Sequence, residues 1–503
     1  MTEAASTGSI LAKTATGTGW VIGWRLAGRL VGLVNTLVLV RLLSPADFGL
    51  VALGASFAQG IDALAMIGIE DAVIRHRAPT QALLNTAFTL GLLRSLLTAG
   101  LAAALAWPAA AFFGEPRLSG VVILLAVSIV IDGLTNIGIV EFRSRFAFDK
   151  EFWLWTLPRL ASLVFSIGAA LLLRSYWALL VGILGHRILR VLASYRMHPH
   201  RPRLTLAAWR ELAGYSAWNW VLGILGTLRG NADSVLIGRL MDSTHVGLFA
   251  LGQELALLPT TELVQPLCRA AFSGFAAVQQ TPERVRETYA RIVASALLVV
   301  LPAGMGLSLV AAPAVALALG PAWQAAVPLV QIMAISGCVI VFSNVSSTLF
   351  RVVGLMRETF QVSLWSTAAR VLLLLALLPV LGLPGGAVAV AVATAVEQAL
   401  YIGLTLRRFG LTLTDIASRT WRIGLATAAM TAGLALSGLG WQASTTTTVA
   451  GRFAELACPV LAGALIYAAA LLAAWLACGR PAGAETDMLG VLRAAALKSG
   501  RGS

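Results

Sequence analysis

The sequence predicts an all-α, polytopic inner-membrane protein of about fourteen transmembrane helices, arranged as two parallel-repeated six-helix lobes plus an accessory C-terminal helix pair. Of its 503 residues, 58% are hydrophobic and only 12% are charged, and the mean hydropathy is +0.83. Soluble domains carry about twice this share of charged residues. Apolar runs recur along the whole chain, and each is long enough to cross roughly 30 Å of hydrocarbon as a helix.

The order of apolar runs predicts six spans before residue 200, six more up to residue 406 and two after it. The predicted spans cover residues 17–40, 48–69, 82–107, 119–140, 153–173, 176–196, 214–238, 246–268, 290–314, 326–349, 360–382, 385–406, 422–441 and 456–478.

The net charge of +14 is explained by membrane topology rather than by a nucleic-acid partner. When the N-terminus is placed inside, most Lys and Arg residues lie in the inner loops, tails and inner span ends. The predicted outer side holds only Arg41, Arg117, Arg174, Arg239 and Arg452. This asymmetry predicts a membrane protein with both termini in the cytoplasm.

A gapless internal repeat supports the two-lobe organisation. Residues 41–54 (RLLSPADFGLVALG) and 239–252 (RLMDSTHVGLFALG) align at an offset of 198 residues, and half of their positions are identical. Each stretch is a short polar bend between two apolar spans. Because the first and seventh spans both run outwards, the repeat is parallel, as in transporters whose halves are related by an axis along the membrane normal.

The repeat and the punctuation of the chain define five predicted segments. They are an N-terminal six-helix lobe (1–197), an interfacial linker between the lobes (198–213), a C-terminal six-helix lobe (214–410), an accessory helix pair (411–479) and a cytoplasmic tail (480–503). The linker sequence HPHRPRLTLAAWREL alternates basic residues and prolines with an amphipathic stretch, which is typical of a segment lying at a membrane surface.

Arginines inside the predicted spans are the first candidate site residues. Arg25 and Arg29 lie one helical turn apart on the first span, so they share a face, and Gly28 and Gly32 beside them would allow close helix packing. An arginine at the centre of a membrane helix costs about 2.5–3.5 kcal/mol on insertion scales. Two readings remain open: an anion site facing an aqueous cavity, or structural pairing with carboxylates such as Asp62.

The seventh span carries a polar and glycine-rich stripe that includes Arg229 and Asp233. Arg229 is a candidate for substrate binding, and Asp62 and Asp233 are candidates for ion coupling. The alternative is that Arg229 and Asp233, one turn apart, form an ion pair that merely makes both tolerable in the membrane.

Several function classes lack their motifs in this sequence. The outer loops are too short to hold the carboxylates or histidines of a membrane glycosyltransferase, and no phosphate-binding GxxxxGK[ST] motif is found. The cysteines show no metal-ligand spacing. The sequence therefore predicts a transporter that is not an enzyme, with no catalytic residue, no metal and no cofactor.

Four segments resemble a known family: LVLVRLLSPADFGLVALGASFAQGIDALAMIGIEDAVIR (37–75), FFGEPRL (112–118), NADSVLIGRLMDSTHVGLFALG (231–252) and LGPAWQAAVPLV (319–330). They resemble the polysaccharide-transporter branch of the multidrug/oligosaccharidyl-lipid/polysaccharide exporter superfamily, which includes the flippases for O-antigen, teichuronic acid and exopolysaccharide. The likeness extends to about residue 410 and is strongest at the two repeat bends.

The resemblance implies two lobes around a central cavity that opens to each side of the membrane in turn. It also implies a substrate, an undecaprenyl-pyrophosphate-linked oligosaccharide moved from the inner to the outer leaflet for cell-surface polysaccharide biosynthesis. By analogy, Arg25, Arg29 and Arg229 would bind the pyrophosphate or acidic sugars. The implied partners are the lipid-linked oligosaccharide and the lipid bilayer, and further candidate partners are the polysaccharide polymerase and glycosyltransferases.

Three alternative functions remain open at this point. A peptidoglycan-precursor flippase and a cation-coupled multidrug exporter belong to the same superfamily. The exporter would favour an acidic, aromatic-lined cavity over an arginine-rich one. The third alternative is a non-transporting membrane scaffold that recruits glycosyltransferases through its basic inner loops.

Overall fold

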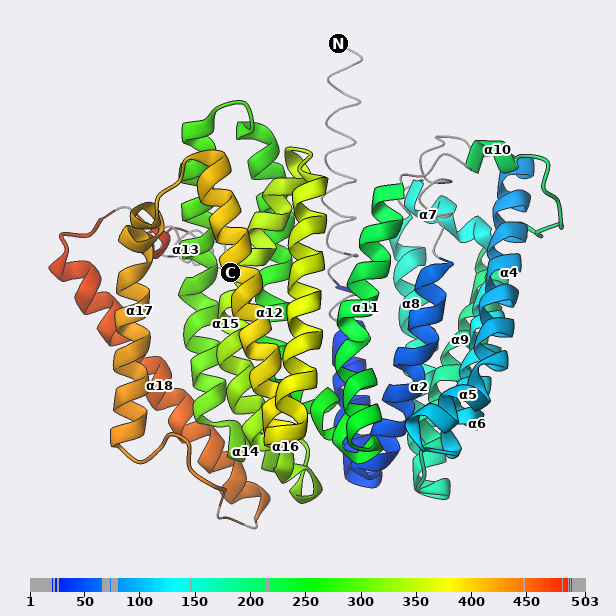
Figure 1. Cartoon of the computed structure of the whole chain (residues 1–503), viewed down its shortest axis with the longest axis horizontal. Helices are drawn as coiled ribbons and strands as arrows, with labels where there is room; N and C mark the ends of the chain where they lie inside the picture. Colours follow the sequence, from blue (N-terminus) through cyan, green and yellow to red (C-terminus); the bar gives the residue numbers. More distant parts are fainter. Residues whose placement is uncertain are drawn as a thin grey trace, which may run out of the picture. The chain divides into compact units, whose positions relative to one another are not determined.

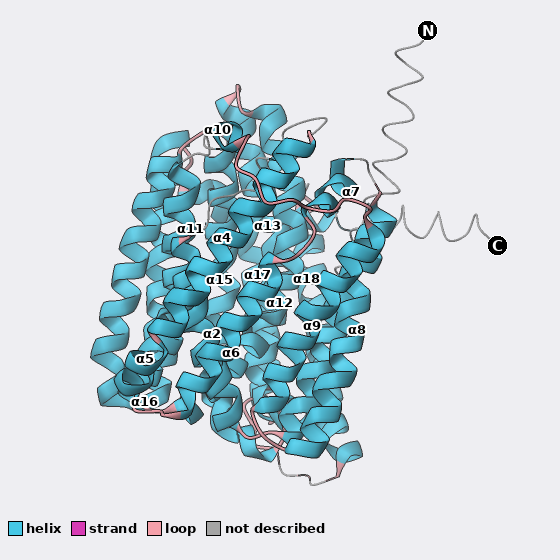
Figure 2. Cartoon of the chain, turned by 90° about the vertical axis from the view of Figure 1, so that its right-hand side faces the viewer, coloured by secondary structure: helices cyan, strands magenta, loops and turns pink. Residues whose placement is uncertain are grey.

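A computed structural model shows α-helices joined by short turns, and the residues that it describes contain no β-strand (Figures 1 and 2). The predicted all-α fold class is confirmed. The structure describes residues 20, 23–24, 27–65, 73, 80–144, 147–212, 217–444, 446, 448–481, 483–486, 488 and 490.

Two compact units make up the chain, residues 1–247 and residues 248–503. The first unit begins with the helical residues 27–42. It continues with α2 (Pro45–Leu64), α4 (Gln81–Ala104), α5 (Ala106–Phe113), α6 (Arg117–Gly133), the 3-10 turn η1 (Ile137–Ile139), α7 (Val140–Ser144), α8 (Phe148–Leu173), α9 (Trp177–Met197), α10 (Trp209–Leu212) and α11 (Ala217–Leu240).

The second unit is equally helical. Its first long helix, α12 (Ser243–Val278), starts within the last residues of the first unit. There follow α13 (Pro282–Leu309), α14 (Ala311–Ala318), the 3-10 segment η2 (Pro321–Ala326), α15 (Val327–Val352), α16 (Met356–Phe409), α17 (Leu413–Leu436) and α18 (Val449–Ala477).

Short polar bends set where the helices begin. Before α2, Ser44 and Asp47 form a reciprocal capping box, and Pro45 occupies the first helical turn, where its missing N–H costs nothing. Thr412 and Asp415 form the same motif before α17. Such caps satisfy backbone N–H groups that would otherwise be unpaired near the membrane surface.

A single glycine divides the long helix α16 into two spans. Gly382 has φ 62° and ψ −150°, a conformation that side-chain-bearing residues rarely adopt, and Pro379 and Pro384 flank it. The break lies at the last residue of the predicted span 360–382, before the predicted span 385–406, so the predicted interruption is confirmed.

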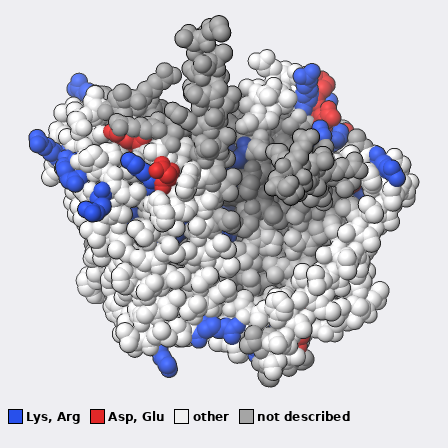
Figure 3. Space-filling view, turned by 180° about the vertical axis from the view of Figure 1, so that it is seen from behind, with Lys and Arg blue, Asp and Glu red and all other residues white. Residues whose placement is uncertain are grey.

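The helices have the length and composition of membrane spans. Within the described residues, seven helical stretches are long and apolar enough to cross a membrane. One face of the surface shows few charged side chains across its middle, whereas Lys and Arg lie towards its ends (Figure 3). Every predicted span overlaps helical residues, which is compatible with fourteen spans. That exact count stays a prediction.

Helix α11 packs against α2 inside the first compact unit. Gly238 of α11 lies so close to Leu53 of α2 that an added Cβ would be 2.7 Å from the leucine Cδ1. The first compact unit therefore extends past the predicted linker to Gly247. The assignment of this helix to a second six-helix lobe rests on the sequence repeat and stays a prediction.

Candidate functional site

The first helix carries one of the two predicted pyrophosphate-binding arginines within the described residues. Arg29 is exposed on the helical residues 27–42, whereas Arg25 lies outside the described residues. The exposed side chain of Arg29 is accessible to a ligand, and its role as a binding residue stays a prediction.

Asp62 of α2 forms an ion pair with Arg94 of α4. The guanidinium Nη2 donates to the carboxylate Oδ1 over 2.6 Å, and both side chains are about one-third exposed. The alternative to a binding role for Arg29 was an ion pair with a carboxylate such as Asp62. In the structure Asp62 pairs with Arg94 instead, and this ion pair connects α2 to α4.

The predicted stripe on α11 places Arg229 and Asp233 on successive turns of one helix face. Asp233 is 2% exposed, and Arg229 is half-buried. A carboxylate buried this deeply costs several kcal/mol unless it is paired or hydrogen-bonded. The role of Asp233 in ion coupling stays a prediction.

A polar cluster that sequence reasoning did not assemble joins α6, α8 and α9. Asp132 of α6 forms an ion pair with Arg190 of α9, with 2.9 Å between Oδ1 and Nη2, and Arg187 lies 3.9 Å from the same carboxylate. The Arg190 guanidinium also lies 4.9 Å from the ring centroid of Trp155 on α8. His186, one turn before Arg190, has a buried Nδ1 without a hydrogen-bond partner. This cluster could not be predicted from the sequence, because it depends on how α6, α8 and α9 are rotated about their axes.

The first helix packs directly on this cluster. Trp24 stacks on Trp155 with ring centroids 5.9 Å apart. The guanidinium of Arg159, on α8, lies against Gly28 and occupies the space that a Cβ on that residue would fill. Because Gly28 precedes Arg29, the structure brings a further arginine to the helix that carries the predicted binding residues. The spacing of Gly28 and Gly32 predicted close helix packing, but it did not predict that Arg159 would be the contacting side chain.

The two repeat bends contact each other symmetrically. A Cβ on Gly49 would collide with the carbonyl oxygen of Ser243, and a Cβ on Gly247 would collide with that of Pro45. The repeat relates the two contacts to each other, since Pro45 corresponds to Ser243 and Gly49 to Gly247. The backbones of α2 and of the first turn of α12 can approach this closely only because both positions are glycine.

Hydroxyl and amide groups form a polar network between α13, α15 and α16 of the second unit. Tyr289 on α13 and Thr405 on α16 both hydrogen-bond the Ser346 hydroxyl on α15, over 2.9 and 3.1 Å. The amide oxygen of Gln398 accepts from the backbone N–H of Ser343 over 2.7 Å. This network joins three helices without charge. Among the described residues, no group of three or more His, Cys, Asp or Glu side chains could hold a metal ion.

Comparison with known sequences gives a consistent picture. A family model described as "Polysaccharide biosynthesis protein" matches residues 38–328. The lipopolysaccharide biosynthesis protein WzxC of Escherichia coli (strain K12) is 21% identical over 344 residues, covering 65% of this chain and 68% of that protein. The succinoglycan biosynthesis transport protein ExoT of Rhizobium meliloti (strain 1021) is 23% identical over 338 residues, covering 66% and 67%.

Solved structures share the fold at low sequence identity. A lipid II flippase MurJ in an inward closed conformation superposes with a TM-score of 0.72 at 14% identity, covering 91% of this chain and all of that chain. An inward-facing multidrug resistance transporter of the MATE family superposes with a TM-score of 0.56 at 15% identity, covering 76% and 94%. These likenesses show the fold.

Proposed function

The chain belongs to the polysaccharide biosynthesis protein family, in the polysaccharide-flippase branch of its exporter superfamily, and we propose that it moves a polyprenyl-pyrophosphate-linked oligosaccharide across the membrane. The proposed direction is from the inner to the outer leaflet of a bacterial cytoplasmic membrane. The observation that carries the proposal is the concentration of guanidinium groups on apolar helices of the first unit, around the helix that bears Arg29.

This chemistry fits a sugar-pyrophosphate headgroup. Moving such a group through hydrocarbon would leave its charges and hydroxyls unpaired, at a cost of tens of kcal/mol for the ions alone. Guanidinium groups bind phosphate oxygens in bidentate fashion and remain charged at all relevant pH values. We assign this role to Arg25, Arg29 and Arg229, and the contact of Arg159 with Gly28 supports adding Arg159.

The proposed transport cycle is alternating access. The symmetric contact of Gly49 and Gly247 supports a closed arrangement at the predicted outer end, which would have to separate before the headgroup leaves. Outward movement of two negative charges follows an inside-negative potential and gains about 4.6 kcal/mol at 100 mV. A coupled cation is therefore not required energetically. Asp62 and Asp233 are the carboxylates whose substitution tests for one.

The test is the leaflet accessibility of polyprenyl-linked oligosaccharides in cells depleted of this protein. We expect one lipid-linked repeat to accumulate in the inner leaflet, and to be released by the intact gene but not by an Arg29→Ala variant that still inserts into the membrane. Arg196→Ala, an exposed arginine at the end of α9, is the matched control and should restore export.

Each alternative has its own result in the same experiment. Accumulation of a peptidoglycan precursor instead of a surface-glycan repeat would replace the proposed substrate. Unchanged lipid-linked sugars together with unchanged surface glycan would reject the flippase proposal. Recovery of full export by Arg29→Ala would remove that residue from the binding site.

A further inference from the structure

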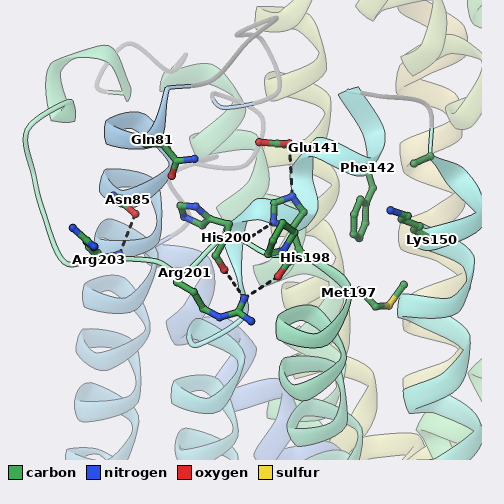
Figure 4. Close-up of a pocket in the computed structure, with 12 residues that line it drawn as sticks. Gln81, Asn85, Glu141, Phe142, Lys150, Met197, His198, His200, Arg201 and Arg203 are labelled. Atoms are coloured by element: carbon green, nitrogen blue, oxygen red, sulfur yellow. Dashed lines mark hydrogen bonds and ion pairs between the residues drawn. The ribbon is translucent and has the colours of Figure 1, made fainter.

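The first unit contains a pocket of about 770 Å³ that is formed by none of the predicted binding residues. It lies where α4 begins, α8 begins and α9 ends, at the predicted inner surface (Figure 4). Its lining includes Gln81 and Asn85 of α4, Lys150 of α8, and His198, His200 and Arg203 of the linker.

Side chains of α4, of the residue before η1 and of the linker itself hold the linker wall of this pocket in place. The Asn136 side-chain amide donates to the carbonyl of His200 over 2.8 Å, and the backbone N–H of Arg203 donates to Asn85 Oδ1 over 3.0 Å. The backbone N–H of His200 donates to His198 Nδ1 over 3.1 Å. The wall is therefore built by specific hydrogen bonds rather than by loose packing.

The charge of the lining is strongly positive. Lys150 and Arg203 have no carboxylate within ion-pair distance among the described residues. Lys150 lies 5.6 Å from the ring centroid of Phe142, and a third cation, Arg201, donates to the carbonyls of His198 and His200. The carboxylate in the lining is Glu141, 3.7 Å from His198 Nε2.

A buried ring nitrogen of His200 without a hydrogen-bond partner is a second, independent observation that points to a ligand in this pocket. His200 is only 7% exposed, and its Nε2 has no hydrogen-bond partner. In Figure 4 its ring lies on the side of the pocket that carries Gln81 and Asn85. A buried polar atom without a partner costs about 1–3 kcal/mol, and a ligand oxygen at this position would remove that cost.

We propose that this pocket binds a phosphate or pyrophosphate ester. Arg and Lys side chains, amide groups and a histidine N–H are the donors that phosphate oxygens accept from. The pocket volume of about 770 Å³ exceeds that of a phosphate ion, so the pocket has room for an ester that carries a larger group. Two sources share this chemistry: a phospholipid or polyprenyl-phosphate headgroup in the membrane, and a soluble phosphate ester.

Neighbouring apolar residues favour the lipid source. Leu204 and Leu206 directly follow the pocket residues on the linker, and they are 71% and 47% exposed. Exposed leucines beside basic residues are typical of a segment that lies in the headgroup region of a bilayer. A headgroup bound here would contact the segment that leads from α9 towards α11. The proposal does not depend on transport activity.

Titration of the full-length protein in nanodiscs of neutral lipid with inorganic pyrophosphate tests the site. We expect saturable binding that weakens about tenfold in Lys150→Gln and in Arg203→Gln, because each loses one charge-assisted contact. Arg210→Gln is the matched control: Arg210 is an exposed arginine of the same linker outside the pocket, and its substitution should leave affinity unchanged.

The second arm of the experiment distinguishes the two sources. Native mass spectrometry of protein purified with anionic phospholipid should show retained lipid that pyrophosphate displaces, and less retention in Arg203→Gln than in Arg210→Gln. Pyrophosphate binding without lipid retention would support the site with a soluble ester as its ligand. Absence of binding in both arms, or equal weakening by Arg203→Gln and Arg210→Gln, would overturn the proposal.

Discussion

Arg94 Nη2 lies 2.6 Å from Asp62 Oδ1, and this ion pair joins α4 to α2. Removing one member leaves the other charged and only partly hydrated. We expect Arg94→Gln to lower the free energy of unfolding by about 1–3 kcal/mol, and the double variant Asp62→Asn/Arg94→Gln to recover part of this loss. Thermal unfolding of the detergent-purified protein measures both effects.

The control for this pair is Arg117→Gln, which breaks the pair of Arg117 with Glu115, because the Arg117 side chain is 49% exposed against 27% for Arg94. Exposed pairs contribute about 0–1 kcal/mol. Equal destabilisation by Arg94→Gln and Arg117→Gln would show that the pair between α2 and α4 contributes no more to stability than the Arg117–Glu115 pair.

Gly28 offers a way to move the Arg159 guanidinium without changing any charge. A valine at this position would collide with the guanidinium, so we expect Gly28→Val to reduce lipid-linked oligosaccharide export about tenfold. Gly32→Val is the matched control on the same helix, because nothing lies within 4 Å of the Cβ that it would add. If both variants export equally well, the position of Arg159 does not matter for transport.

The contact between the two repeat bends predicts a specific change in accessibility. In a chain whose native cysteines are replaced by alanine, a Ser243→Cys probe is expected to react slowly with an impermeant thiol reagent, since Ser243 is 8% exposed. Gly49→Ala should speed this reaction about tenfold, because the added methyl group forces the backbones apart. Gly60→Ala, in the same helix with open space around it, should leave the rate unchanged. An unaltered rate in Gly49→Ala would contradict the role of the contact as a closure.

Glu115 predicts a small dependence of stability on pH. A hydrogen bond from Arg117 lowers the pKa of the Glu115 carboxyl below 4.5, against the opposing effect of burial. A lowered pKa in the folded state stabilises the protein above pH 4.5, and this contribution falls as the pH drops through the folded-state value. We expect wild type to be slightly more stable than Glu115→Gln at neutral pH and the difference to vanish in acid. Thermal melts of wild type and Glu115→Gln from neutral to acid pH measure the sign of the stability difference. The opposite sign would show that Glu115 is held protonated.

The ion pair between Arg422 and Glu485 attaches the C-terminal segment to α17. Two hydrogen bonds of 2.8 and 3.3 Å join these side chains, which are each about 5% exposed. Glu485→Gln should leave a buried guanidinium without its counter-charge and cost about 3–5 kcal/mol of local stability. Faster proteolysis after residue 477 would report this release. Arg419→Gln, which breaks a pair of 3.9 Å with an exposed partner, is the control that should not accelerate cleavage.

The fold class follows from composition and periodicity alone, because runs of apolar residues are strong signals of membrane helices. The break at Gly382 was likewise predictable from the proline and glycine residues around it. The pairing of charges was not. Asp62 and Arg94 both stand out as charges in apolar helices, but which arginine meets which carboxylate depends on helix rotation, and a single sequence carries no information about that.

The pocket at the linker shows a different limit. The basic and proline-rich character of residues 198–203 predicted a segment at the membrane surface. The structure places these residues directly after α9, and their location at a membrane surface stays a prediction. Their contribution to a pocket depends on Asn85 and Asn136, which hydrogen-bond the backbone of the linker from distant parts of the chain. Neither asparagine belongs to a recognisable motif.

The symmetric contact of Gly49 and Gly247 bears on the origin of the chain. A two-fold contact in which a residue meets its own equivalent is the kind that two identical subunits form. A protein consisting of one repeat could therefore have associated in pairs through this glycine, and fusion of two gene copies would have preserved the interface without inventing a new one. A later substitution at either Gly49 or Gly247 would have disturbed the same contact. Both halves therefore kept glycine at this position while their other residues diverged.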